Sequence, residues 1–114
     1  MGIKNITTQE GLDQELLSKG NKFLLFYSAW DPFCVDFAPA FEKLAASNPE
    51  SFCKVSIDTL PETADTYSVG VVPSVLFFLG GKLEKRLDAR PDQGLTAESL
   101  AEFVWLCRGI INRG

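Results

Sequence analysis

The side chains able to do covalent chemistry in this chain are three cysteines, Cys34, Cys53 and Cys107. The sequence contains no histidine, which excludes serine–histidine and cysteine–histidine catalysis and every histidine-ligated metal site. No two cysteines have C-x-x-C spacing, and a thiolate zinc or iron–sulfur site built by this chain alone would normally need four ligands. We therefore expect no metal and no cofactor, and any reactivity must come from a single thiol.

Cys34 is the best placed of the three, because it ends the stretch Trp30-Asp31-Pro32-Phe33-Cys34 at the expected start of a helix. A helix N-terminus lowers the pKa of a thiol, but the carboxylate of Asp31 within the same turn opposes that effect. Two interpretations stay open: a structural cysteine without chemistry, or a regulatory thiol that forms mixed disulfides or glutathione adducts. Cys53 and Cys107 fall on apolar stripes and are expected to be small core residues.

Length and composition place these thiols in one globular domain spanning residues 1–114. The chain has 114 residues, of which 46% are apolar and 23% charged, enough for one hydrophobic core. The net charge of −4 argues against nucleic acid and anionic membranes as partners, since both select clustered Lys and Arg. No apolar run is long enough to predict a membrane span. An odd, sparse cysteine count suits a reducing compartment, so we expect a cytoplasmic protein, or one shared between cytoplasm and nucleus.

Hydrophobic periodicity predicts alternating strands and helices that must position these residues. Strands are expected at residues 3–6, 23–27, 52–57, 75–79 and 82–87. Helices are expected from a Thr7-x-x-Glu10 capping box through Leu17, at 34–45, at 60–67 and from a cap at Thr96 to 111. A Gly-Gly pair at 80–81 predicts the hairpin turn between the last two strands. This order predicts an α/β fold with a central mixed sheet and helices on both faces.

The order and several motifs resemble the thioredoxins. Residues 30–34 stand where thioredoxins carry Trp-Cys-x-x-Cys, and Pro39 stands at the position of their helix proline. Val72-Pro73 matches their cis-proline. The resemblance covers essentially the whole chain, apart from an apparent insertion around residues 90–93, and it implies the thioredoxin-like fold.

Two parts of the thioredoxin mechanism have no counterpart here. Asp31 stands at the position of the attacking cysteine, and a carboxylate cannot form a mixed disulfide. Leu25 stands in place of the family's buried aspartate, which manages the proton of the resolving thiol. Lys54 stands at the position of the lysine that partners this aspartate, and is expected to have lost that role. We therefore predict that dithiol–disulfide exchange is absent.

A closer resemblance is to the N-terminal thioredoxin-like domains of multidomain monothiol glutaredoxins, which carry Trp-Ala-x-x-Cys and also lack the buried aspartate. The matching segments are residues 56–58, 60–62, 67–69, 72–74 and 76–78. Such proteins act in iron–sulfur and iron homeostasis through a separate glutaredoxin domain, whose Cys-Gly-Phe-Ser motif does not occur in this sequence. The Trp-Asp-Pro-x-Cys pattern is also similar to a spliceosomal thioredoxin-like family, which lacks the proline matched by Pro73 and therefore ranks lower.

The resemblance also implies a groove in which the backbone beside the cis-proline binds an extended protein segment by strand addition. We expect a protein-binding module in cell redox or iron–sulfur homeostasis. The alternative is a weak monothiol redox protein that uses Cys34, with glutathione as its small-molecule partner. The expected groove residues are Trp30, Asp31, Pro32, Phe33, Val72 and Pro73.

Trp105 is a large apolar residue that points away from the expected core. At 100° per residue it lies roughly 140° from Leu100, opposite the apolar stripe of the last helix. An exposed tryptophan on a terminal helix is either an interface residue or a plain surface residue.

Overall fold

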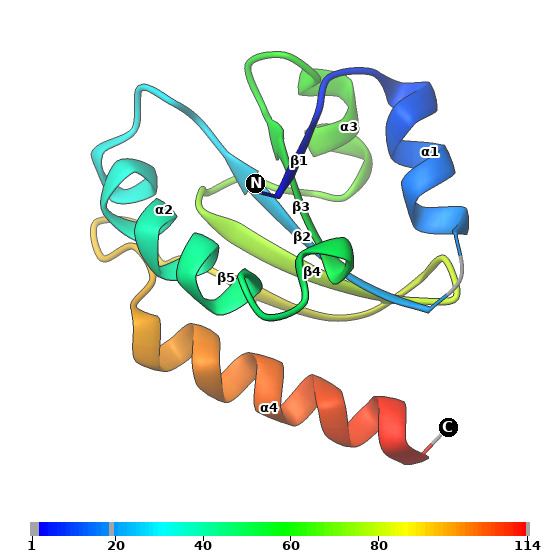
Figure 1. The fold of residues 1–114 in the computed structure, drawn as a ribbon. Helices are drawn as coiled ribbons and strands as arrows, with labels where there is room; N and C mark the ends of the chain where they lie inside the picture. Colours follow the sequence, from blue (N-terminus) through cyan, green and yellow to red (C-terminus); the bar gives the residue numbers. More distant parts are fainter. Residues whose placement is uncertain (1–2, 19, 114) are drawn as a thin grey trace.

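The computed structural model describes residues 3–18 and 20–113, with the side chain of residue 113 left out. In chain order the elements are β1 (Lys4–Ile6), α1 (Gln9–Leu17), β2 (Asn21–Tyr27), α2 (Pro32–Ala45), the 3₁₀ turn η1 (Pro49–Ser51), β3 (Phe52–Ser56), α3 (Pro61–Thr66), β4 (Ser74–Leu79), β5 (Lys82–Asp88) and α4 (Ala97–Arg113) (Figure 1). The predicted order of strands and helices is confirmed. Among the described residues, no helix combines the length and apolarity needed to cross a bilayer.

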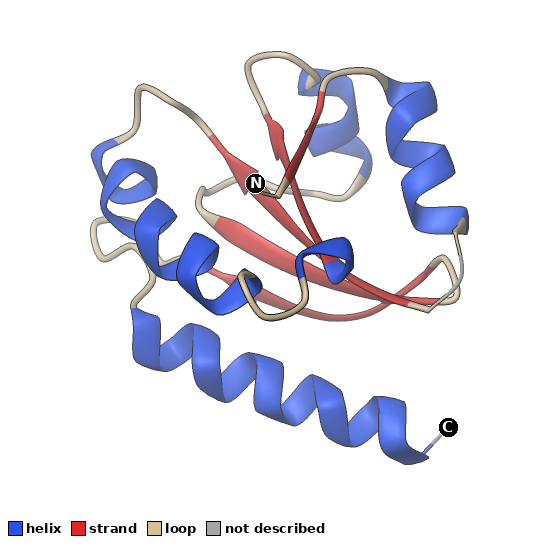
Figure 2. Ribbon diagram, in the orientation of Figure 1, coloured by secondary structure: helices blue, strands red, loops and turns tan. Residues whose placement is uncertain are grey.

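The strands form one mixed sheet in the order β1-β3-β2-β4-β5. Strand β3 pairs in parallel with β1 and β2, whereas β4 pairs antiparallel with β2 and β5. The central strands β2 and β4 are buried along nearly their whole length, as expected of strands covered on both faces. Helices α1 and α3 cover one face of the sheet, and α2 and α4 cover the other (Figure 2). The predicted fold class is therefore confirmed.

The two faces of the sheet bury two separate apolar clusters. Leu12 and Leu16 of α1 pack on one face, together with Cys53. Phe41 of α2 packs on the other face, together with Cys107. Both cysteines are fully buried, which raises the pKa of Cys53 to about 12 and that of Cys107 to about 11. Their expected place in the core is confirmed, and each lies in a different cluster.

Helix α1 begins one residue later than predicted. Its N-cap is Thr8, whose Oγ1 accepts a hydrogen bond from the backbone N–H of Gly11 at 2.9 Å. Both Thr7 and Thr8 fit the sequence pattern of a cap, but Thr8 is the residue with extended backbone directly before the first helical turn. The last helical residue is Leu17, the last residue expected in this helix. Helix α4 is capped at Thr96 as predicted, with Oγ1 accepting from the N–H of Ser99 at 3.0 Å.

Candidate functional site

Asp31 begins helix α2 by capping it. Its carboxylate accepts hydrogen bonds from the backbone N–H of Phe33 at 2.8 Å and of Cys34 at 3.3 Å. Pro32 follows as the first helical residue, a position at which the missing N–H of proline does no harm. The Asp-Pro pair therefore starts the helix, and the carboxylate of Asp31 accepts from the N–H of Phe33 and shares the N–H of Cys34 with the Asp31 backbone carbonyl, which lies 3.0 Å from that nitrogen.

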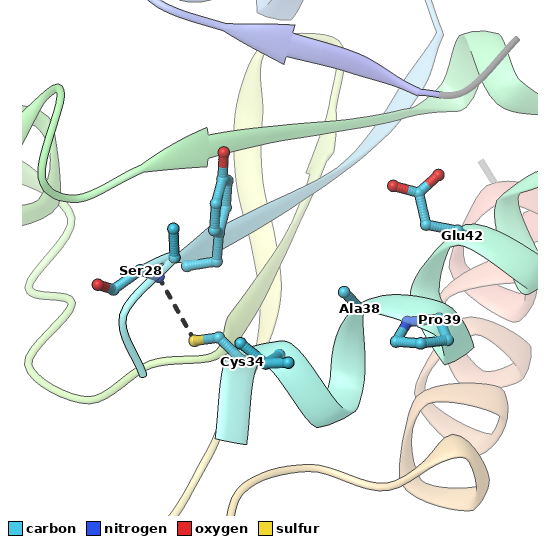
Figure 3. Close-up of a pocket in the computed structure, with 8 residues that line it drawn as sticks. Ser28, Cys34, Ala38, Pro39 and Glu42 are labelled. Atoms are coloured by element: carbon cyan, nitrogen blue, oxygen red, sulfur yellow. Dashed lines mark hydrogen bonds between the residues drawn. The ribbon is translucent and has the colours of Figure 1, made fainter. Parts of the chain in front are cut away.

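Cys34 is buried, with 5% of its surface exposed. Its sulfur accepts a hydrogen bond from the backbone N–H of Ser28 at 3.4 Å, drawn as the dashed line in Figure 3. The hydroxyl of Ser28 in turn donates to Asp58 at 2.7 Å. Ser28, which follows β2 and contacts the sulfur, is therefore itself held in place.

The pKa of the Cys34 thiol is raised above its ordinary value, chiefly by burial. The N–H of Ser28 acts in the opposite direction, and the charges of Asp31 and Asp58 add to the increase. The balance expected from the sequence, between the helix terminus and Asp31, is therefore decided by burial. A thiol in this environment stays protonated at neutral pH and is a poor nucleophile.

Leu25 and Lys54 occupy the positions at which the family carries its buried aspartate and the lysine that partners this aspartate. Leu25 is 3% exposed and lies in the apolar cluster beneath α2 and α4, in register with Lys54 on β3. The ammonium of Lys54 pairs with the carboxylate of Glu42 on α2 at 3.2 Å. It also lies 5.6 Å from the centre of the Tyr27 ring. Lys54 therefore has a new anionic partner on the helix.

A pocket of about 420 Å³ lies beside Cys34, between the end of β2 and helix α2 (Figure 3). Its lining is Tyr27, Ser28, Ala29, Cys34, Val35, Ala38, Pro39 and Glu42. Of the site residues expected from sequence, Cys34 alone lines this pocket. This pocket could not be found from the sequence, because its walls come from β2 and α2 and no local pattern specifies how these two elements approach each other.

Of the expected groove residues, Asp31 is half-buried and the others divide into an exposed and a buried group. Trp30 is 87% exposed, and Pro32 and Phe33 also reach the surface. Val72 and Pro73 are buried, and the peptide bond between them is cis. Within the described part of the chain, the backbone of Val72 makes no hydrogen bond to another backbone group.

Phe33 packs against the loop that follows β5, where the sequence shows its apparent insertion. Gly94 of this loop has φ +69°, and a β-carbon added there would lie 2.8 Å from the Phe33 ring. The loop is closed on itself by an isolated bridge between Arg90 and Gly94. The start of α2 and the 89–95 loop thus form one surface, and only glycine permits their close approach.

No group of three or more Cys, Asp or Glu side chains is placed to hold a metal ion within residues 3–18 and 20–112. The candidate site therefore consists of a capped helix start, one buried thiol, an adjoining pocket and the exposed Trp30.

The comparisons with known proteins agree with this geometry. The family model described as Thioredoxin matches residues 3–104. Thioredoxin of Mycoplasmoides gallisepticum is 35% identical over 96 residues, which cover 82% of this chain and 95% of that protein. Mouse Glutaredoxin-3 is 34% identical over 87 residues, which cover 73% of this chain and 26% of that protein. The chain thus spans about a quarter of that relative's length.

Solved structures give the same fold. The structure of Fasciola hepatica thioredoxin superposes with a TM-score of 0.79 at 30% identity, covering 90% of this chain and 96% of that one. A structure of Plasmodium falciparum thioredoxin gives a TM-score of 0.81 at 19% identity, with the same coverage of both chains.

Proposed function

Because the chain belongs to the thioredoxin family, we propose that it is a member without disulfide-exchange chemistry, acting as a protein-binding module in cell redox or iron–sulfur homeostasis. The observation that carries this proposal is the role of Asp31. The residue at the family's attacking position is a carboxylate that caps α2 through two backbone N–H groups.

Disulfide exchange requires two thiols with separate tasks. The first, as a thiolate, attacks one sulfur of the substrate disulfide, and the other substrate sulfur leaves as a thiolate. The second thiol then attacks the mixed disulfide, which releases the remaining substrate thiolate and leaves a protein disulfide. Asp31 cannot take the first step, and Cys34 is protonated and buried. Cys53 and Cys107 lie inside the two apolar clusters and offer no replacement.

Binding without covalent chemistry is supported by the surface around the start of α2. Trp30 presents a large exposed ring, and tryptophan is enriched among the residues that dominate protein interfaces. The backbone of Val72, which has no backbone partner among the described residues, fits the addition of an extended segment as an extra strand. The similarity to Glutaredoxin-3 over 73% of this chain supports the redox setting, and the resemblance of the sequence to monothiol glutaredoxins adds the iron–sulfur setting.

The free cysteines and the net charge support a compartment and a class of partner. We place the chain in the cytoplasm, with the nucleus as a second compartment, because its three cysteines are free. Protein segments are the proposed partners, whereas the net charge of −4 disfavours nucleic acid and anionic membranes.

An insulin-reduction turbidity assay tests the loss of exchange chemistry. The wild-type chain is expected to give no acceleration over dithiothreitol alone. Asp31→Cys supplies the missing attacking thiol and is expected to accelerate the reaction about ten-fold or more over its control. The matched control is Asp31→Ser, which keeps a capping oxygen without a thiol. Wild-type activity near that of a thioredoxin would overturn the proposal.

Retention of partners from a cell extract, identified by mass spectrometry, tests the binding surface. Trp30→Ala removes the exposed ring, and Leu17→Ala is the matched control because Leu17 is 78% exposed on α1. Redox and iron–sulfur proteins are expected to be retained by the wild type and the control and lost by Trp30→Ala. The same set on all three chains would contradict the proposed surface.

The second candidate function is that of a weak monothiol redox protein. The observation in its favour is that the sulfur of Cys34 lines the 420 Å³ pocket. In this reaction the Cys34 thiolate attacks one sulfur of oxidised glutathione and the disulfide bond breaks. A protein–glutathione mixed disulfide forms, and the departing glutathione thiolate takes up the proton that Cys34 released. The raised pKa of Cys34 opposes this step at neutral pH, so its reactivity decides between the two functions.

A further inference from the structure

Helix α4 carries a continuous exposed face on the side turned away from the sheet (Figure 1). The face consists of Glu98, Ala101, Glu102, Trp105, Arg108, Gly109 and Asn112, all of them exposed. At 100° per residue, every member lies within about 60° of Trp105 around the helix axis. Trp105 itself is 73% exposed at the centre of this face.

The face is symmetric in sequence about Trp105. Glu102 stands three positions before it and Arg108 three positions after it. Ala101 stands four positions before it and Gly109 four positions after it. The first half of the face is therefore acidic and the second half basic, with one small residue on each side of the tryptophan. Among the described side chains, neither Glu102 nor Arg108 forms an ion pair within the chain.

We propose that this face binds a second copy of the chain, with the two α4 helices antiparallel across a two-fold axis at Trp105. In this arrangement Glu102 lies opposite Arg108 of the second copy, and the same pair occurs twice. Ala101 lies opposite Gly109 of the second copy, where the small side chains let the two helices approach. The two Trp105 rings then meet on the axis and are shielded from water.

The symmetry of the face favours a second copy over an unrelated partner. A two-fold interface uses the same patch on both subunits, so its charges must reverse about the axis. The α4 face has this property, whereas parallel pairing would set Glu102 against Glu102. A single helix pair buries less than the roughly 800 Å² per partner of a standard interface. The dimer is therefore expected to dissociate on dilution.

Sedimentation velocity over a hundred-fold range of protein concentration tests the proposal. The wild-type chain is expected to shift from monomer to dimer. Trp105→Glu, which places two carboxylates on the axis, is expected to weaken association about a hundred-fold or more. The matched control, Leu17→Glu, adds the same charge on α1 and is expected to leave the association unchanged.

Charge exchange between two variants identifies the pairing itself. Glu102→Arg alone sets arginine against arginine, and Arg108→Glu alone sets glutamate against glutamate. Each is expected to weaken self-association about ten-fold or more. An equimolar mixture of the two is expected to form a heterodimer of wild-type affinity, because both cross pairs again become attractive. Residues 102 and 108 do not face each other along one helix, so this rescue reports contact between two chains.

Three results would overturn the proposal. They are a wild-type chain that stays monomeric at all concentrations, a dimer unaffected by Trp105→Glu, and a mixture of the two charge variants that does not associate. Circular dichroism of each variant separates lost association from lost folding.

Discussion

Asp31 and Cys34 share one helical turn, and each determines what the other does. The N–H of Cys34 donates to the Asp31 carboxylate, so the helix start that would stabilise a thiolate is already neutralised by a negative charge. That charge also raises the pKa of Cys34, in addition to the larger effect of burial. Asp31 therefore replaces the attacking thiol of the family and also lowers the reactivity of the thiol that remains, Cys34.

The raised pKa of Cys34 predicts a low rate of glutathione addition at neutral pH. Only the thiolate attacks a disulfide, and a raised pKa leaves less thiolate at about pH 7 than a free cysteine has. The rate should rise about ten-fold per pH unit until the raised pKa is reached. Intact mass after incubation with oxidised glutathione at about pH 7 and about pH 9 measures this dependence.

Cys34→Ser is the control for this experiment, because the other two cysteines are fully buried. Modification of the wild type at neutral pH as fast as that of an unfolded cysteine peptide would favour the monothiol function over the binding module.

Helix α1 provides a prediction at the scale of one element. Thr8→Ala is expected to lower the free energy of unfolding by about 1 kcal/mol, because the N–H of Gly11 loses its acceptor. Thr7→Ala is the matched control and should change it by less than about 0.5 kcal/mol, as an exposed substitution without a cap. Urea unfolding measures both. Equal losses in the two variants would place the cap elsewhere.

The elements could be predicted where local pattern alone decides them. The apolar run at 23–27 and the Gly-Gly turn predicted β2, β4 and β5, and both turn glycines have positive φ. The start of α1 could not be located, because adjacent threonines satisfy one pattern and backbone conformation selects between them. The place of Asp31 in the first helical turn beside Cys34 was predicted from the sequence. The burial of Cys34 was not, because its covering groups belong to other segments.

The pairing of Lys54 with Glu42 joins the sheet to α2 and predicts coupling across the molecule. Leu25→Asp is expected to lower the free energy of unfolding by about 3 to 5 kcal/mol. It buries a carboxylate whose in-register neighbour, Lys54, is already paired with Glu42. Adding Glu42→Gln releases Lys54 to pair with the new carboxylate. The double variant should therefore lose less unfolding free energy than the sum of the losses of the two single variants, by about 0.5 to 3 kcal/mol.

Urea unfolding of the four chains in this cycle measures the coupling. Leu25→Asn is the matched control, because it is polar and uncharged and should combine additively with Glu42→Gln. Additive costs for Leu25→Asp would show that Lys54 does not reach position 25 when it is released.

Contacts between distant segments set the limit of sequence-based prediction for the site. Lys54 is 12 residues from Glu42, and Phe33 meets Gly94 across most of the chain. The pocket beside Cys34 likewise requires β2 and α2 in their final positions. No periodicity or motif specifies such pairs, whereas the mixed sheet with helices on both faces followed from the alternation of elements.

The ion pair between Lys54 and Glu42 also bears on how this chain could evolve. A cysteine at position 31 would return a dithiol without the carboxylate and lysine that manage its proton in the family. An aspartate at position 25 would be opposed until position 42 also changed. Full recovery of the chemistry therefore needs at least three coordinated substitutions, of which the second is harmful on its own. Descendants of this sequence are accordingly expected to diversify in what they bind, since single mutations can change binding, whereas a single mutation restores only part of the exchange chemistry.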